Sequence, residues 1–494
     1  MMDVSHLLLQ SIIAPLIFSP IVFVLGRGAR ESSGWIALIP LAYSLICLMA
    51  SSIPAYLFGE PVSASYSWAK PLGSLTLLLD GISAPVALTI IIVSIIVCAY
   101  SLTYMRSEPS LQGYYALYLL FVSGMLGTVL SINLAAFFLF FELMLIASWL
   151  LIALWGEEGR ARAALKYFIY TEAGALFLLA GIAMTYALTG TLDLLEVHAR
   201  VGGLAGGVIA LIVSLMFIGF LVKMAIFPFH SWLPDAYTEA PMPITAIFST
   251  MTGIGGYAAL RILYTGFPAM LKREEFMLAL AILALITMIY GGYLALAQER
   301  LKRLLAYSSI SQMGYLLFGV AAASIIGLAG AILIYVAHSL AKALLFMVSG
   351  ALSRSVGTDR LDELGGLAGR MQLTSIAFMI GFLSLMGFPP LLGFWGELFI
   401  FAGSIYRAFS MSVDILRLSV TMIAIVFAII TAGYSLWTIK RSLFGEQSEA
   451  VRKAGAEPKL MLAPILASAI MLIIFGIQPT LLTKLLETLA PVLS

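Results

Sequence analysis

The feature that most constrains this sequence is a succession of apolar runs that recurs along the whole chain. Each run is about 20 residues long, which matches the hydrocarbon core of a bilayer when the run is helical. Charges and clusters of Pro, Gly and Asn separate fourteen such runs, at residues 6–26, 34–57, 79–105, 114–131, 133–155, 163–188, 205–227, 242–264, 276–296, 303–322, 325–351, 372–406, 414–439 and 460–489. The sequence therefore predicts an all-α, polytopic membrane protein of about fourteen transmembrane helices, the first of them retained as a helix.

Composition excludes several other classes of protein. Charged residues make up 11% of the chain, whereas soluble domains carry roughly 25%. The net charge of +2 provides no field that would attract nucleic acid. Cys47 and Cys98 lie too far apart for a disulfide framework or a sulfur-ligated metal, and the histidines are too scattered for a metal cluster. We expect no metal and no cofactor, so that any redox centre belongs to a partner.

Two prolines suggest an internal repeat. Pro228 and the Pro389–Pro390 pair each follow a Phe, precede a Trp and interrupt an apolar span. Proline removes a backbone donor, so both spans should break, and each is the fourth of a set of five. Because five is odd, the second set would be inverted relative to the first, an arrangement typical of ion pathways. We predict helices 1–3 with an extramembrane hairpin in residues 1–113, five-helix repeats at 114–264 and 276–439, and a loop and helix 14 at 440–494.

The distribution of Lys and Arg predicts the orientation of the chain. Loops after odd-numbered spans carry sixteen basic residues, and the opposite side, with both termini, carries seven. Basic loops stay in the cytoplasm. We therefore expect a multi-pass protein of the cell membrane with both termini on the non-cytoplasmic side.

Some charged residues lie inside the apolar spans and need a separate explanation. Glu142, Lys223 and Lys342 have no opposite charge one turn away on their own helix, and Glu397 follows the second proline break. A charge at the bilayer centre costs about 2.5–3.5 kcal/mol and usually faces a bundle interior, a partner or water. Lys166 and Arg261 lie nearer span ends, where snorkelling anchors are expected. Glu172 is intermediate and receives no predicted role.

Polar groups gather on one face of the span at 325–351. His338 and Lys342 are one helical turn apart, with Tyr335 and Ser339 on the same face. If both were charged, each would disfavour the charge of the other, which suits a pair that passes a proton. Ser308 and Gln312, in the preceding span, belong to a polar stripe that could hydrate the same region or hold helices together.

Four stretches carry a resemblance to a known family. They are Phe-Phe-Glu-Leu-Met-Leu-Ile around Glu142, the segments at 223–241 and 302–315, and His-Ser-Leu-Ala-Lys-Ala-Leu-Leu-Phe at 338–346. The sequence resembles the antiporter-like, proton-pumping membrane subunits of respiratory complex I, Mrp-type sodium/proton antiporters and archaeal membrane-bound hydrogenases. The resemblance covers spans three to thirteen.

The resemblance implies roles for particular residues. Glu142 and Lys223 would form the acid–base pair of the first half, His338 and Lys342 the central relay, and Glu397 the terminal group. Many relatives have a lysine in the eighth span where this chain reads Met-Thr-Gly-Ile-Gly-Gly-Tyr around Gly253. That link would then depend on water or on His230, Ser249 and Thr252.

The resemblance also implies a function and partners. The chain would translocate protons, alone or in exchange for sodium, as a subunit of a multisubunit respiratory complex in the lipid bilayer. Its partners would be homologous antiporter-like subunits, small membrane subunits and, in redox-driven complexes, a peripheral redox arm. The residues do not distinguish between two parent complexes, a translocating oxidoreductase and an Mrp-type antiporter. The rivals are a self-sufficient transporter of a small solute, an intramembrane enzyme and a purely structural subunit.

Overall fold

The computed structural model describes residues 4–28, 30–69, 72–410, 413–455, 457 and 459–489. Most of them are helical, as the apolar runs predict. The α-helices are α1 His6–Leu25, α2 Ser33–Phe58, α3 Ser83–Tyr104, α4 Leu111–Leu130, α5 Leu134–Trp155, α6 Arg160–Thr189, α7 Leu194–Val201, α8 Gly206–Lys223, α9 Trp232–Glu239, α10 Met242–Arg261, α11 Glu274–Leu296, α12 Leu301–Ala321, α13 Ile325–Ser355, α14 Gln372–Leu385, α15 Leu392–Phe409, α16 Ile415–Leu443, α17 Glu449–Lys453, α18 Lys459–Ile477 and α19 Thr480–Thr483.

Shorter elements complete the chain. A π-helical turn, η2, continues α10 over Ile262–Gly266. The 3₁₀ turns are η1 Arg30–Ser32, η3 Pro268–Lys272, η4 Leu361–Glu363, η5 Leu367–Gly369 and η6 Lys484–Leu489. Strands β1 Val62–Ser67 and β2 Ser74–Leu79 form an antiparallel hairpin, in register from Val62 opposite Leu79 to Ser67 opposite Ser74. This is the hairpin expected between the second and third spans.

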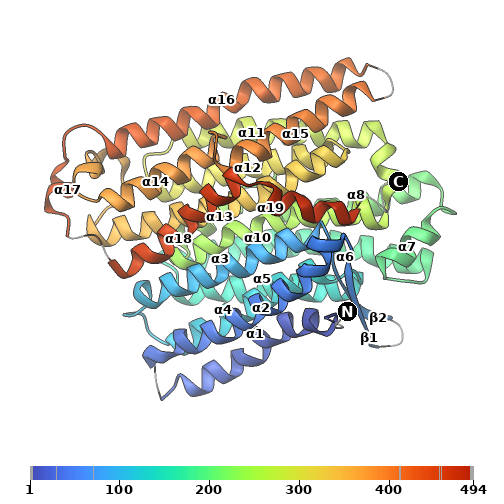
Figure 1. The fold of residues 1–494 in the computed structure, drawn as a ribbon, viewed down its shortest axis with the longest axis horizontal. Coiled ribbons are helices and arrows are strands. Elements are labelled where there is room, and N and C mark those ends of the chain that lie inside the picture. Colours follow the sequence, from blue (N-terminus) through green and yellow to red (C-terminus); the bar gives the residue numbers. More distant parts are fainter. Residues whose placement is uncertain are drawn as a thin grey trace.

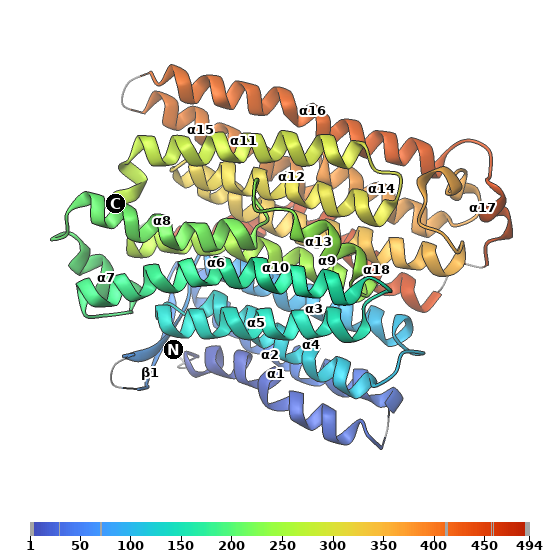
Figure 2. The same ribbon diagram turned by 180° about the vertical axis from the view of Figure 1, so that it is seen from behind.

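The membrane character of the chain is evident from its helices. Thirteen helices of the described residues are long and apolar enough to cross a bilayer. The long helices run side by side, with α1 along one edge of the bundle and α16 along the opposite edge (Figures 1 and 2). The start of α1 and the β-hairpin lie at the same end of the bundle, and α17 lies at the opposite end (Figure 1). The chain is an all-α, multi-pass membrane protein.

Burial distinguishes the centre of the bundle from its edges. The apolar membrane-spanning stretches of α10 and α13 are completely buried inside the protein. In α1 and α16, most residues of the corresponding stretch are not buried. The ionisable side chains within the buried stretch of α13, His338 and Lys342, therefore face protein and not lipid. The two five-helix repeats stay a prediction, but both proline breaks inside them are present.

Candidate ion pathway

The first proline break places Lys223 at the end of a helix in the middle of the bundle. α8 ends at Lys223, and α9 begins only at Trp232. Ala225 has a positive φ of 54°, and Pro228 has no N–H to continue the helical ladder. The indole Nε1 of Trp232 donates to the Val222 carbonyl at 3.0 Å. A side chain thus satisfies a carbonyl that the break releases.

The second break is stabilised in a comparable way. α14 ends at Leu385 and α15 begins at Leu392. The amide Nε2 of Gln312, on α12, donates to the Leu385 carbonyl at 3.1 Å. Gly387 lies in the break with a φ of 71°, and a Cβ there would come 2.6 Å from Glu397 Oε2. The broken backbone therefore forms one wall of the space that holds the Glu397 carboxylate.

Lys223 is enclosed by aromatic side chains. It is 1% exposed, and its Nζ lies 5.4 Å from the ring centroids of both Phe141 and Tyr167. Nζ donates a hydrogen bond of 3.2 Å to the Tyr167 hydroxyl. That hydroxyl lies 2.7 Å from Ser148 Oγ on α5. Tyr167 was not anticipated from the sequence, because a tyrosine in an apolar helix carries no signal of its own.

Glu142 lies on α5, close to a second carboxyl group. Its charge interacts with those of Glu172 and Lys223. Glu142 Oε1 is buried and accepts no hydrogen bond from the described residues. Because α5 and α6 are consecutive helices joined by a short loop, the Ser148–Tyr167 contact fixes a register that brings these two acids together.

The expected acid–base pair is therefore not a direct ion pair in this structure. No N···O distance of 4.0 Å or less joins Lys223 to Glu142, although their charges interact over a longer range. Tyr167 and Phe141 surround the ammonium instead. In a low-dielectric interior a separation of this kind still allows strong coupling between two charges.

The eighth-span position without a lysine is filled by another helix. A Cβ on Gly253 would lie 2.5 Å from Cδ2 of Tyr335, so the tyrosine ring of α13 occupies the space of a side chain there. The Tyr335 hydroxyl donates to the Thr250 carbonyl at 3.0 Å. A lysine at position 253 is incompatible with this packing.

Polar groups on α9 and α10 lie between Lys223 and α13. Thr252 Oγ1 is 2.6 Å from the Tyr237 hydroxyl, and the Tyr237 ring packs on Phe248, which also contacts the Tyr167 ring. Ser249 Oγ lies 3.0 Å from the Ser339 carbonyl, one residue after His338. Ser249 and Thr252 therefore lie where the link was expected.

His230, the third candidate for that link, lies elsewhere. It is partly buried in the segment between α8 and α9. Its ring stacks on Phe227 at 5.6 Å and meets the edge of Tyr290, on α11, at 4.8 Å. The structure does not bring His230 together with Ser249 or Thr252.

The central pair lies in α13, at the centre of the bundle. His338 is 1% exposed and Lys342 is fully buried. Lys342 Nζ donates to the Leu305 carbonyl at 2.8 Å and also to Ser308 Oγ. Neither ring nitrogen of His338 has a hydrogen-bond partner among the described residues. Buried polar atoms normally have partners, so a working His338 needs hydration or movement of a neighbour.

A polar strip connects Lys342 to the second break. Ser308, which Lys342 contacts, is one turn from Gln312, which caps α14. The Tyr434 hydroxyl of α16 is buried without a hydrogen-bond partner among the described residues, and it interacts with the charge of Glu397. Glu397 is partly buried and has no ion pair among the described residues. Tyr434, like Tyr167, carries no signal in the sequence.

The snorkelling interpretation of Arg261 is wrong. Arg261 is 1% exposed, and its Nη1 and Nη2 each lie 2.7 Å from a carboxylate oxygen of Asp80. Asp80 Oδ1 also accepts from the backbone N–H groups of Ile82 and Ser83 at the start of α3. Burial alone would raise the pKa of Asp80, but the Arg261 charge and these hydrogen bonds outweigh it and lower that pKa.

Three other basic residues also pair within the protein. Lys166 forms a 2.7 Å ion pair with Asp235 and stays partly exposed. The prediction of orientation places Lys302 and Arg417 among the basic residues of the loops, but both are buried. Lys302 donates to the Ala240 carbonyl and to Glu157, and Arg417 donates to the Ala321 carbonyl and to Glu274. These contacts hold helix ends and lie outside the central line.

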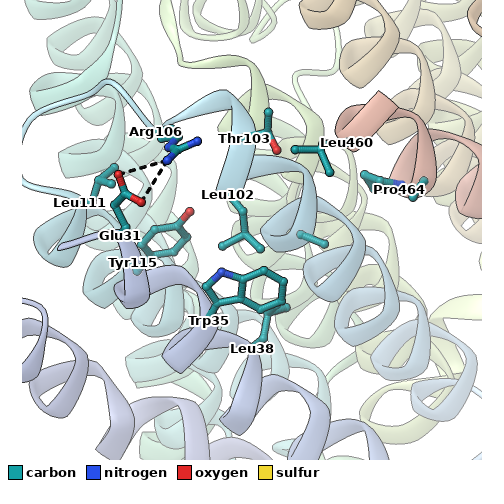
Figure 3. A pocket seen from close by; sticks show the side chains of 12 residues that line it. Glu31, Trp35, Leu38, Leu102, Thr103, Arg106, Leu111, Tyr115, Leu460 and Pro464 are labelled. Carbon is teal, nitrogen blue, oxygen red and sulfur yellow. Dashed lines mark hydrogen bonds and ion pairs between the residues drawn. The ribbon is translucent and has the colours of Figure 1, made fainter. Parts of the chain in front are cut away.

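A groove on the surface lies apart from this line. Trp35, Leu102, Leu460 and Pro464 line it between α2, α3 and α18, and the ion pair of Glu31 with Arg106 lies at its rim (Figure 3). None of the ionisable residues of the central helices contributes to it.

The comparisons with known proteins agree with this architecture. Residues 131–428 match the family model described as NADH:quinone oxidoreductase/Mrp antiporter, TM, and residues 72–115 match the N-terminal model of complex I chain 5. The F(420)H(2) dehydrogenase subunit M of Methanosarcina mazei is 32% identical, over 97% of this chain and 96% of that protein.

Solved structures show the same fold. A chain of the Mrp complex from Dietzia sp. DQ12-45-1b superposes with a TM-score of 0.86 at 25% identity, covering 99% of this chain and 97% of that chain. A chain of the membrane-bound sulfane sulfur reductase, an archaeal respiratory membrane complex, gives a TM-score of 0.86 at 26% identity, with 99% and 97% coverage. The chain thus belongs to the family of antiporter-like, proton-translocating membrane subunits found in NADH:quinone oxidoreductases and Mrp antiporters.

Proposed function

We propose that the protein moves protons along a line of buried side chains at mid-depth of the bundle, from Glu142 and Lys223 through His338 and Lys342 to Glu397. The observation that carries this proposal is the placement of these residues. Lys223 ends α8 at the first break, Lys342 lies in the buried central stretch of α13, and Glu397 faces the second break. Ionisable groups in such positions are functional by default.

The proposed driving step is an exchange of partners around Lys223. When Lys223 faces Glu142, the opposite charge favours the ammonium form. When a neighbouring subunit attracts Glu142, the isolated ammonium is unfavourable in an apolar interior and releases its proton toward α13. The long-range coupling of Glu142 and Lys223 supports this step.

The second half of the path delivers the proton to one side of the membrane. Ser249 and Thr252 occupy the region between Lys223 and α13, and Ser308 contacts Lys342. Side-chain hydroxyls can donate and accept in turn. Glu397, without an ion pair among the described residues, is the proposed terminal group.

We further propose that the protein works in the cell membrane, with both termini on the non-cytoplasmic side, next to other antiporter-like and small membrane subunits. The support is that relatives come from multisubunit membrane complexes, together with the excess of basic residues in loops after odd-numbered spans. Whether a redox arm drives the complex is decided by its other subunits. Subunit identification in the purified complex distinguishes an oxidoreductase from an Mrp-type antiporter.

Proton flux through the reconstituted complex tests the function. We expect Lys223→Ala and Glu142→Gln to abolish flux, and Glu397→Gln to uncouple transport from the chemistry of any redox partner. The exposed Lys453, replaced by Ala, is the control and should leave flux unchanged. Normal flux in either Lys223→Ala or Glu142→Gln, with the complex assembled, rejects the proposal. Measuring sodium flux in the same vesicles separates pumping from exchange.

A further inference from the structure

Tyr167 and Ser148 form a hydrogen-bonded pair of hydroxyl groups beside Lys223. Tyr167 is fully buried, its ring packs on Trp232 and Phe248, and its hydroxyl is the acceptor for the Lys223 ammonium at 3.2 Å. No other hydrogen-bond acceptor contacts Lys223 among the described residues. A hydroxyl group that accepts a hydrogen bond from a buried ammonium competes with any nearby carboxylate as the partner of that ammonium.

The direction of each hydrogen bond shows what this pair can do. Ser148 Oγ donates its proton to the Leu145 carbonyl at 2.9 Å, so it is available as an acceptor for the Tyr167 hydroxyl at 2.7 Å. Lys223 therefore donates to Tyr167, and the Tyr167 hydroxyl has two acceptors, Ser148 Oγ and Met251 Sδ at 3.4 Å. Ser148 in turn donates to a backbone carbonyl. Neither a backbone carbonyl nor a thioether passes a proton on, so the chain of donors ends inside the bundle and is unsuited to carry protons.

We propose that Tyr167, supported by Ser148, is a positioning residue that holds Lys223 away from Glu142 in one of the two states of the switch. The inference rests on the proposed function, which it deepens by naming the second partner of Lys223. In this structure the Lys223 ammonium donates to the Tyr167 hydroxyl, and no ion pair joins it to Glu142. In the other state Lys223 leaves the hydroxyl and pairs with Glu142.

A two-state switch needs two states of similar free energy. The interaction of Lys223 with Tyr167 must therefore be comparable in strength to its interaction with Glu142. A buried ammonium beside a free carboxylate would form an ion pair that is hard to separate. A hydroxyl acceptor stabilises the separated state, because a hydrogen bond to a charged group is stronger than one between neutral groups. Without it, we expect Lys223 to remain with Glu142 and the cycle to slow.

The experiment uses the purified complex in proteoliposomes with the substitution Tyr167→Phe, which removes one oxygen atom and keeps the ring. The matched control is Tyr118→Phe, since Tyr118 is also fully buried and donates to a backbone carbonyl, that of Ser94, at 2.7 Å. We expect proton flux to fall roughly tenfold or more in Tyr167→Phe and to stay unchanged in Tyr118→Phe. Ser148→Ala should lower flux less, because Tyr167 keeps its hydroxyl.

An infrared spectrum provides a readout that packing alone would not change. Glu142 Oε1 is buried without a hydrogen-bond partner among the described residues, and apolar surroundings favour the protonated form of a carboxyl group. Glu142 should therefore contribute a protonated carboxyl band, identified by its absence in Glu142→Gln. In Tyr167→Phe the freed Lys223 should convert this band to a carboxylate band. Flux equal to that of wild type, or reduced flux without the spectral change, overturns the inference.

The two proposals fail in different ways. If Lys223→Ala transports normally, the proposed function is wrong whatever Tyr167 does. If Lys223→Ala is inactive while Tyr167→Phe behaves like Tyr118→Phe in flux and spectrum, only the role of Tyr167 is rejected.

Discussion

The carboxylate of Glu397 lies against the backbone of Gly387, so that a Cβ added to Gly387 would come 2.6 Å from Glu397 Oε2. The glycine belongs to the break between α14 and α15, and its φ of 71° is left-handed. The interruption of one helix thus shapes the space around the proposed terminal group.

Gly387→Ala should reduce proton flux without altering any ionisable group. The new methyl group displaces the Glu397 carboxylate, and the left-handed backbone adds a strain of about 1–2 kcal/mol. Proton flux and thermal unfolding of the complex provide the measurements. Gly207→Ala is the control, because nothing lies within 4 Å of a Cβ at Gly207. Equal flux in the two variants would contradict a role for this contact.

Ser308→Ala should slow transport through the central helix. Ser308 and Ser309 both donate to the Leu305 carbonyl, but only Ser308 also contacts Lys342. Loss of a hydrogen bond to a charged group changes stability by about 1.5–3 kcal/mol, which alters how Lys342 holds its proton. Flux should fall in Ser308→Ala and stay near wild type in Ser309→Ala. The reverse order would exclude Ser308 from the path.

Gln312→Ala should destabilise the second break. Without the Gln312 amide, the Leu385 carbonyl loses the side-chain donor that now caps it, at a cost of about 1–3 kcal/mol. We expect a lower midpoint of thermal unfolding together with lower flux. Gln298→Ala is the matched control, since Gln298 Nε2 also donates to a backbone carbonyl, that of Leu294 near the end of the preceding helix. A midpoint in Gln312→Ala no lower than in Gln298→Ala would refute the capping role.

Asp80→Asn should be among the most destabilising single substitutions. It leaves Arg261 buried without its carboxylate partner, a change that costs about 3–5 kcal/mol. Glu31→Gln, at the exposed pair with Arg106, should change the unfolding midpoint little. Comparable midpoints for the two variants would show that the buried pair contributes little.

The same pair predicts how stability depends on pH. Because the folded-state pKa of Asp80 is lowered, its contribution is complete above the unfolded-state value, about 3.9. It is lost as the pH falls through the lower folded-state value. The midpoint of thermal unfolding of the wild type should therefore fall at acid pH. The part of this decrease that comes from Asp80 should be missing in Asp80→Asn.

The sequence by itself determined the membrane class, the positions of most spans and the two breaks. Apolar runs of bilayer length and prolines within them act locally, through backbone hydrogen bonding that lipid cannot replace. It also identified Glu142, Lys223, His338, Lys342 and Glu397 as candidates, because a charge inside an apolar run is conspicuous without any knowledge of its neighbours.

Only the tertiary structure decided which side chains meet. Lys223 contacts Tyr167 and not Glu142, Arg261 pairs with Asp80, and Tyr335 fills the space beside Gly253. Each of these contacts joins different helices. Helical periodicity describes the faces of one helix, but the register and rotation of two packed helices depend on side-chain shapes along their whole interface. In an interior of low dielectric, that packing determines the partner of every charge.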